Sequence, residues 1–414
     1  MNASIDRSGP RIAFAFTGQG AQYPGMTARL YLGHDGYRRH LDAAAEALRP
    51  YTGTSVTDLI VRGDLRVHQT GFTQPTMFAI EYALAATLLD AGIRPVAVIG
   101  HSIGEFAASV VAGGLCLDDA ALLVAVRGAY MQYLPSGGGM LAVRAAPEEL
   151  EHFVQRSAKV GFGAFNGPRA TVLSGDLGAL EHIHDELTRR KVAARLLQVS
   201  HGFHSPLMQP MLQRFARVAS RVPPNPPKLA FYSTVRGRRL LNEALGALYW
   251  TEHISAPVRF AQAAQRLLAE QNLDMVLEIG PKPVLTNLVK ALAGDDGPAC
   301  VPVCRSEDTD AAALVALIAE LLPHEALDDD PVREAVYSAV SRLVNDPCAR
   351  IGPDVALRGD LGFDSVMVMQ LTYQLEQRLP ALGKLSLPDM LDSIVTPATL
   401  VEYLRGQLSA GLVA

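Results

Sequence analysis

The apolar residues of this chain follow two alternating patterns between positions 11 and 322. Short apolar runs bounded by Pro, Gly or polar residues predict buried strands at 11–16, 95–99, 229–233 and 275–279. Between them, Ala- and Leu-rich stretches at helical spacing predict helices at 37–49, 75–91, 117–133 and 310–322. We place one helix start at Gln74-Pro75, because Pro is tolerated in the first helical turn. Alternating strands and helices predict an α/β fold.

Positions 137–200 change character and predict an inserted subdomain. In chain order they predict a strand, a helix, two strands, a helix and a strand, at 140–144, 147–156, 160–166, 170–175, 177–190 and 194–199. This βαββαβ order is typical of the ferredoxin-like unit.

Beyond position 322 the pattern becomes all-helical. Residues 323–330 have the composition of a linker, and the helices that we predict after it lie at 331–344, 366–379, 387–391 and 397–408. Positions 326–414 hold twelve acidic and seven basic residues, which accounts for the net charge of −5 of the whole chain. A small acidic module therefore follows a larger neutral part, and neither is basic enough to suggest nucleic-acid binding.

The composition excludes several other classes of protein. With 414 residues and 49% apolar content, the chain is long enough for two or three packed domains. It offers no apolar run long enough for a membrane span and no secretory pattern at its start. Its four cysteines show neither disulfide nor zinc spacing, and we interpret Cys300 and Cys304 as apolar residues of one short strand. These features favour a reducing, cytoplasmic setting.

The segment Gly100-His101-Ser102-Ile103-Gly104-Glu105 lies between a predicted strand and a predicted helix. A Gly-x-Ser-x-Gly pattern in that context is a nucleophile elbow, although a tight glycine turn is the simpler alternative. The helix N-terminus and the Ile103 amide then lie beside the Ser102 hydroxyl, where an oxyanion would form. A second glycine turn follows the first strand, and the Gln19 amide in it is a candidate second oxyanion donor.

Three further residues carry candidate chemistry. Arg127 lies in an apolar helix and needs either an anionic ligand or a structural ion pair. His201 and His204 follow the predicted insert and lack a third metal ligand, so we interpret this segment as the source of a base for Ser102.

Taken together, these motifs resemble the malonyl-type acyltransferases of polyketide and fatty-acid synthases, followed by an acyl carrier protein. The matching segments begin at Phe16, Gly100, Arg127, Ala164, His201, Tyr249, Pro257, Glu278 and Leu361. The resemblance implies a large α/β-hydrolase-like subdomain with an inserted ferredoxin-like subdomain, then a small four-helix carrier domain. It implies an acyltransferase over 8–322, a linker over 323–330 and a carrier over 331–410.

The resemblance also implies a mechanism. Ser102 would attack an acyl-CoA thioester, His204 would take its proton, and a second thiol would accept the acyl group from the serine. The amides of Gln19 and Ile103 would hold the oxyanion. In the family, a backbone carbonyl of the stretch that here reads 251–254 orients the histidine, and His253 replaces the usual Asn or Gln there.

The acyl group that the resemblance favours is malonyl. Arg127 would bind the malonyl carboxylate, and the residues around the substrate would be His101, His201, Phe203, Gln74 and Asn166. The family's His-Ala-Phe-His accompanies malonyl, and this chain departs from it only at Gly202. Alternatives are another carboxyacyl unit such as methylmalonyl, a proofreading hydrolase of carrier-bound chains, or a carrier whose acyltransferase half is silent.

The segment from Leu361 to Ser365 resembles the carrier family's attachment site, with Val366 in place of the usual Leu. Ser365 would carry 4′-phosphopantetheine, added by a phosphopantetheinyl transferase, although a Ser at a helix start can be a simple N-cap. The partners would be malonyl-CoA, its own or other carrier domains, and a ketosynthase or other synthase modules. We expect no metal, nucleic acid or membrane among the partners. Polyketide synthases of this kind suggest antibiotic biosynthesis.

Overall fold

The computed structural model describes residues 10–322, 331–344, 355–386, 390 and 394–411. The chain divides into two compact units, Met1–Pro323 and His324–Ala414. Within the described residues, no helix is both long and apolar enough to cross a membrane.

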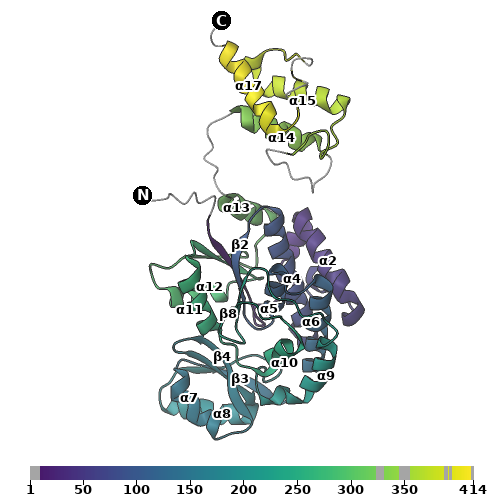
Figure 1. Cartoon of the computed structure of the whole chain (residues 1–414). Helices are drawn as coiled ribbons and strands as arrows, with labels where there is room; N and C mark the ends of the chain where they lie inside the picture. Colours follow the sequence, from purple (N-terminus) through teal and green to yellow (C-terminus); the bar gives the residue numbers. More distant parts are fainter. Residues whose placement is uncertain (1–9, 323–330, 345–354, 387–389, 391–393, 412–414) are drawn as a thin grey trace. The chain divides into compact units, whose positions relative to one another are not determined.

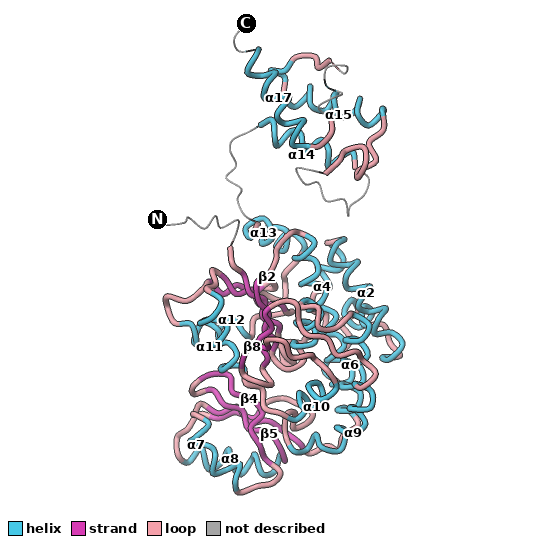
Figure 2. The backbone as a smooth tube through the Cα atoms, in the orientation of Figure 1, coloured by secondary structure: helices cyan, strands magenta, loops and turns pink. Residues whose placement is uncertain are grey.

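A six-stranded sheet forms the centre of the first unit (Figure 2). Its strands lie in the order β10 (Ala299–Pro302), β9 (Met275–Ile279), β1 (Ile12–Phe16), β2 (Pro95–Gly100), β7 (Ala230–Ser233) and β8 (Arg238–Leu240). The first five are parallel, and β8 pairs with β7 antiparallel. Parallel strands end at one edge of a sheet, so the loops after β1, β2 and β9 lie next to one another.

Strand β1 shows why both faces of this sheet are covered. Its bulky residues Ile12, Phe14 and Phe16 pack into one apolar core, and Ala13 and Ala15 pack into another. The helices on the bulky face include α2 (Asp35–Thr52), α4 (Thr70–Asp90), α5 (Gly104–Val111) and α6 (Leu117–Gln132) (Figure 1). The alanine face is covered by α11 (Phe260–Gln271) and α12 (Leu285–Ala293).

Helix α4 begins at Thr70, so the predicted start at Pro75 is wrong. Gln69 is extended and accepts the amides of Phe72 and Thr73 through its carbonyl, which starts the helix one turn earlier. The early turn is stabilised because Thr70, Thr73 and Gln74 are buried, and this packing outweighs the one backbone hydrogen bond that Pro75 cannot make.

The insert has the predicted βαββαβ order. Its elements are β3 (Gly138–Val143), α7 (Pro147–Gln155), β4 (Val160–Gly167), β5 (Ala170–Asp176), α8 (Leu177–Arg189) and β6 (Ala194–Leu196). They form an antiparallel sheet of order β4-β5-β3-β6, and the last strand is shorter than predicted.

The remaining helices of the first unit connect or flank these sheets. They are α1 (Ala28–Gly33), α3 (Val56–Val61), α9 (Gln209–Ala219), α10 (Ala247–Ser255), α13 (Ala311–Leu321) and the short 3-10 helices Leu65–His68 and Pro206–Met208. Cys300 lies in β10, but Cys304 lies beyond the strand's end, so the two do not share one strand as predicted.

The second unit is helical where it is described, with α14 (Pro331–Leu343), α15 (Ser365–Arg378), the 3-10 helix Pro380–Leu382 and α17 (Pro397–Gly411). Val336, Leu371 and Leu404 are fully buried at its centre and join these helices into one core. The helix predicted near 387–391 lies mostly outside the described residues.

Candidate active site

Ser102 lies on the turn between β2 and α5, in a backbone conformation with φ 50° that L-residues rarely adopt. The glycines on either side are required by close backbone contacts. A Cβ on Gly100 would lie 2.3 Å from the Glu105 nitrogen, and one on Gly104 would lie 2.4 Å from the Thr17 carbonyl oxygen. The turn is therefore a tight strand-to-helix elbow that presents the Ser102 side chain at the sheet edge.

His204 is the base nearest to Ser102. The Ser102 hydroxyl lies 2.7 Å from His204 Nε2, and His204 Nδ1 lies 2.8 Å from the Ala256 carbonyl oxygen. Because that carbonyl can only accept, Nδ1 carries the proton and Nε2 is free to accept the hydroxyl proton. Burial, assisted by the Arg127 charge, lowers the pKa of His204 to about 3, so the ring is neutral at physiological pH.

The carbonyl that orients His204 belongs to Ala256 and not to the 251–254 stretch that the resemblance suggested. Residues of that stretch lie inside α10, so their carbonyls point along the helix axis, and the Glu252 carbonyl accepts the Ala256 amide. Ala256 follows the last helical residue and is extended, so its carbonyl turns out of the helix.

His253, the residue that stands where the family has an amide, also contacts the elbow. Its Nε2 donates to the Ser102 carbonyl oxygen at 3.0 Å, and its ring packs edge-on against Phe106. Burial lowers the pKa of His253 well below its ordinary value, so it acts as a neutral donor that holds the turn.

Glu105, in the first turn of α5, is completely buried. It accepts hydrogen bonds from the Tyr249 hydroxyl and from the backbone and hydroxyl of Thr234. Burial raises the pKa of Glu105 to about 7, and these donors oppose the rise. The carboxyl group ties the elbow helix to β7 and α10. This role of Glu105 was not predicted from the sequence, where the available signal is an acidic residue directly after the Gly-x-Ser-x-Gly pattern.

Arg127 reaches the same serine from α6. Its side chain is 1% exposed, and its Nη2 donates to the Ser102 oxygen at 3.3 Å. Its Nε is buried and has no hydrogen-bond partner. Burial lowers the pKa of Arg127 to about 9, which leaves the guanidinium charged at neutral pH, and Glu105 is the acidic group that opposes the shift. No ion pair of Arg127 appears among the described residues, so a structural ion pair does not account for it.

A cavity of about 230 Å³ opens beside these groups, and we call it the catalytic cavity. Its lining includes Ser102, His204, Arg127, Gln19, Gln74, His101, Asn166 and Phe203. His101 Nε2 lies 2.9 Å from the Asn166 side-chain oxygen, and Gln74 donates weakly toward Gln19. Gln74 also leaves its own side-chain oxygen buried without a partner. The structure therefore brings together most of the residues that the sequence predicted for the substrate.

Two predicted site residues do not line the cavity. The His201 ring is held between the Ser200 hydroxyl and the Leu134 carbonyl oxygen, at 2.9 and 3.1 Å. Ile103 is fully buried, which leaves only its backbone to act. Within the described part of the chain, no protein acceptor takes a hydrogen bond from the Ile103 or Gln19 amide.

Gly202, the departure from the family pattern, also lies outside the lining. A Cβ there would meet the Gly175 carbonyl oxygen at 2.8 Å. The glycine thus permits close backbone packing at the end of the insert, and it does not enlarge the cavity.

Ser365 lies in the second unit at the first residue of α15, with an exposed side chain. The N-cap is Asp364, whose side chain accepts the amides of Val366 and Met367 at 2.9 and 2.8 Å. Because Asp364 caps the helix, the capping interpretation of Ser365 is wrong. An exposed hydroxyl on an ordered helix end fits an attachment point for a phosphate-linked arm.

The described residues hold no group of three or more His, Cys, Asp or Glu side chains arranged for a metal ion.

Comparison with protein families agrees with this arrangement. Residues 13–321 match the acyl transferase domain, and residues 334–404 match the phosphopantetheine attachment site. The chain belongs to the acyl transferase family and is an acyltransferase. Its C-terminal unit is a carrier domain of the type that bears phosphopantetheine covalently on a serine.

Its relatives are modular synthases. Polyketide synthase GfsB of Streptomyces halstedii is 39% identical over 321 residues, which are 76% of this chain and 6% of that protein. Phenolphthiocerol synthesis polyketide synthase Pks15/1 of Mycobacterium marinum is 39% identical over 68% of this chain and 13% of its own length. The chain thus spans a small part of these curated relatives.

Solved structures show the same fold. The acyltransferase domain from the second module of the salinomycin polyketide synthase has a TM-score of 0.70 and 38% identity, covering 74% of this chain and 72% of that chain. The malonyl CoA-acyl carrier protein transacylase of Clostridium perfringens has a TM-score of 0.68 and 27% identity, covering 77% and 99%.

Proposed function

We propose that this chain transfers a malonyl unit from malonyl-CoA, through an acyl-serine at Ser102, to the phosphopantetheine thiol of an acyl carrier domain in polyketide biosynthesis. The observation that carries the proposal is the buried Arg127 guanidinium beside the Ser102 hydroxyl. A buried cation without a carboxylate partner, placed at a nucleophile, suits a substrate that brings its own carboxylate.

In the first half-reaction, Ser102 Oγ attacks the thioester carbonyl and its proton passes to His204 Nε2. The Ala256 carbonyl keeps the proton of Nδ1 in place and stabilises the imidazolium that forms. The amides of Gln19 and Ile103 hold the negative oxygen of the tetrahedral intermediate, each contributing roughly 3 kcal/mol. The C–S bond then breaks, and the leaving CoA sulfur takes the proton from His204.

In the second half-reaction the carrier thiol replaces CoA. His204 Nε2 accepts the thiol proton, the sulfur attacks the acyl-serine carbonyl, and the C–O bond to Ser102 breaks as the serine regains its proton. Ser365 is the residue that we assign to hold the phosphopantetheine arm, which supplies this thiol when attached. The enzyme that attaches the arm would be a phosphopantetheinyl transferase, and the product would pass to a ketosynthase or another synthase module.

Two side chains select the acyl group. Arg127 pairs with the terminal carboxylate through parallel hydrogen bonds and so disfavours neutral acyl groups. Phe203 lines the catalytic cavity and limits the space for a substituent on the α-carbon. His101, Gln74 and Asn166 supply the remaining polar contacts from the same lining. A proofreading hydrolase of neutral chains would have no use for the Arg127 charge.

The two subdomains divide this work. We interpret the larger sheet, with its serine on a strand-to-helix turn, as α/β-hydrolase-like, and the insert as ferredoxin-like, which its strand order supports. The larger subdomain provides Ser102 and Arg127, and the segment after the insert provides Phe203 and His204.

Competition between malonyl-CoA, methylmalonyl-CoA and acetyl-CoA, read by mass spectrometry of the Ser102 peptide, tests the proposal. We expect malonyl to dominate, and Phe203→Ser to admit methylmalonyl while still rejecting acetyl. A wild-type preference for acetyl-CoA would overturn the malonyl assignment. Comparing release of the acyl group to water with its transfer to the carrier thiol separates the transferase from the hydrolase.

A further inference from the structure

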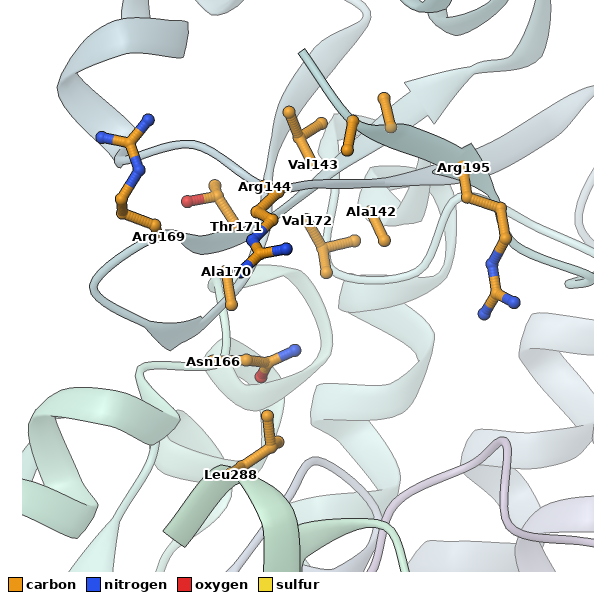
Figure 3. Close-up of a pocket in the computed structure, with 12 residues that line it drawn as sticks. Ala142, Val143, Arg144, Asn166, Arg169, Ala170, Thr171, Val172, Arg195 and Leu288 are labelled. Atoms are coloured by element: carbon orange, nitrogen blue, oxygen red, sulfur yellow. The ribbon is translucent and has the colours of Figure 1, made fainter. Parts of the chain in front are cut away.

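A second hollow, of about 460 Å³, lies beside the catalytic cavity, and it is lined by residues of the insert and by Leu288 of α12. Its floor is apolar and includes Ala142, Val172 and Leu288. Three arginines line it: Arg144 after β3, Arg169 before β5, and Arg195 in β6. In the view of Figure 3, Ala142 and Val172 lie between Arg144 and Arg195. We call this hollow the arginine groove.

The charges in the arginine groove are incompletely paired. Arg169 forms an ion pair with Glu149, with nitrogen and oxygen 2.6 Å apart. Among the described residues, no carboxylate lies within 4.0 Å of Arg144 or Arg195, and no acidic residue lines the groove. Several exposed guanidinium groups over an apolar floor form a surface that attracts anions.

The arginine groove adjoins the catalytic cavity, and the two hollows share part of their walls. Asn166, Val172 and Leu288 line both hollows. Asn166 also holds His101, the neighbour of the nucleophile, at 2.9 Å. A long substrate whose thioester lies at Ser102 can therefore pass Asn166 and place its far end among the arginines.

We infer that the arginine groove binds the phosphate-bearing nucleotide end of the acyl-CoA donor, with Arg144 and Arg195 contacting its phosphates. This inference rests on the proposed function and adds a donor subsite to it. A CoA thioester brings a diphosphate and a phosphate monoester, about four negative charges at neutral pH, and an apolar-faced base for the floor. The arm of a carrier domain brings a single phosphodiester, so the groove favours the donor over the acceptor.

The test compares two donors that share the thioester and differ in the nucleotide. Malonyl-CoA and malonyl-pantetheine are offered to the full chain and to Arg144→Gln, Arg195→Gln and the double variant, and the kcat/KM of acylation at Ser102 is measured. With malonyl-CoA we expect the double variant to lose at least about tenfold, because each charge-assisted hydrogen bond contributes roughly that factor. With malonyl-pantetheine we expect wild-type rates. Added salt should slow wild-type acylation by malonyl-CoA more than that of the double variant.

Arg214→Gln serves as the matched control, since Arg214 is an exposed arginine on α9 outside the groove lining. Unchanged malonyl-CoA acylation in the double variant, or equal losses with both donors, would overturn the inference. A loss confined to transfer from acyl-Ser102 to the carrier thiol would overturn it too, by assigning the groove to the acceptor. In each of these cases, acylation of the wild-type protein at Ser102 keeps the proposed function intact. Failure of both donors to acylate the wild-type protein would count against the proposed function itself.

Discussion

The Ser102 hydroxyl lies between a base and a guanidinium, and at neutral pH the base is uncharged and the guanidinium is charged. His204 accepts its hydrogen bond at 2.7 Å, and Arg127 donates to the same oxygen at 3.3 Å. The Arg127 charge helps keep His204 neutral, and in the proposed function the same guanidinium would also bind the carboxylate of the substrate. Under the proposed function, the acyl group would therefore be selected at the position where it reacts.

Replacing Arg127 tests its role in selection. We expect Arg127→Ala to lower the kcat/KM for malonyl-CoA by more than tenfold, because the malonyl carboxylate then loses its partner at a cost of about 2 kcal/mol or more. Relative acylation by acetyl-CoA should rise in the same competition assay. Arg127→Lys is the matched control, since lysine keeps the charge without the paired hydrogen bonds. Its kcat/KM for malonyl-CoA should lie between those of the wild type and Arg127→Ala. An alanine variant that still prefers malonyl-CoA would remove Arg127 from selection.

The lowered pKa of His204 predicts a pH effect on stability. Between pH 6.5 and 3 the unfolded chain binds a proton at His204 and the folded chain does not, so this residue makes the fold less stable as the pH falls. From pH 7 to pH 5 the loss is about 2 kcal/mol. We expect the Tm of His204→Gln to fall less between pH 7 and pH 5 than the Tm of the wild type. An equal loss in both proteins would mean that His204 titrates normally.

The residues that could be predicted from the sequence are those in contiguous motifs. Ser102 and His204 each lie in a recognisable segment, and the structure brings them into contact. The Ala256 carbonyl and the role of His253 could not be predicted, because they depend on where α10 ends and on which face it turns toward the elbow. His201 was expected at the substrate, but its ring is held by the Leu134 carbonyl outside the cavity.

At the scale of elements, the site depends on how closely β1, β2 and α5 approach one another. The β1 carbonyl of Phe16 accepts the His101 amide at 2.9 Å, which joins the end of β1 to the elbow. Glu278 at the end of β9 accepts the amides of Val284, Leu285 and Thr286, so this carboxylate fixes the start of α12 at the rim of the cavity. The end of β1 thus holds the elbow that carries Ser102, and a side chain of β9 holds the helix at the rim of the cavity.

Gly104 gives a direct test of this close packing. A methyl group there would lie 2.4 Å from the Thr17 carbonyl oxygen, and backbone cannot move aside as a side chain can. We expect Gly104→Ala to lower the free energy of unfolding by about 3 kcal/mol and to abolish acylation. Gly71→Ala is the control, because its Cβ would meet only ordinary contacts at 3.7 Å, and it should change stability by less than about 1 kcal/mol. Equal stability of the two variants would contradict the packing argument.

Elements were predicted well where the apolar pattern alone decides them and less well where tertiary contacts do. The strands at 12–16 and 275–279 are made almost entirely of apolar residues and are buried on both faces, which is typical of central parallel strands. The start of α4 was missed because buried contacts of Thr70 and Thr73 extend the helix beyond its Pro.

At the scale of the whole molecule, the chain combines an acyltransferase with a carrier domain, and each has its own apolar core. Separate cores predict separable chemistry. We expect Ser365→Ala to block attachment of phosphopantetheine by a phosphopantetheinyl transferase and to leave malonylation of Ser102 at the wild-type rate. Mass spectrometry of the intact protein reads both modifications. The control is Ser174→Ala, at a buried serine of the first unit, which should leave the attachment of phosphopantetheine unchanged. A Ser365→Ala protein that still gains phosphopantetheine would exclude Ser365 as the attachment site.

The central claim is that Ser102 carries the acyl group between donor and acceptor. Its most direct test is peptide mapping of the protein after brief incubation with malonyl-CoA, before phosphopantetheine is attached. We predict one malonyl group on the peptide that contains Ser102 in the wild type, and none on any peptide of Ser102→Ala, whose fold is intact by circular dichroism. A Ser102→Ala protein that gains malonyl at the wild-type rate, or a wild type that is malonylated on another residue, would contradict the account.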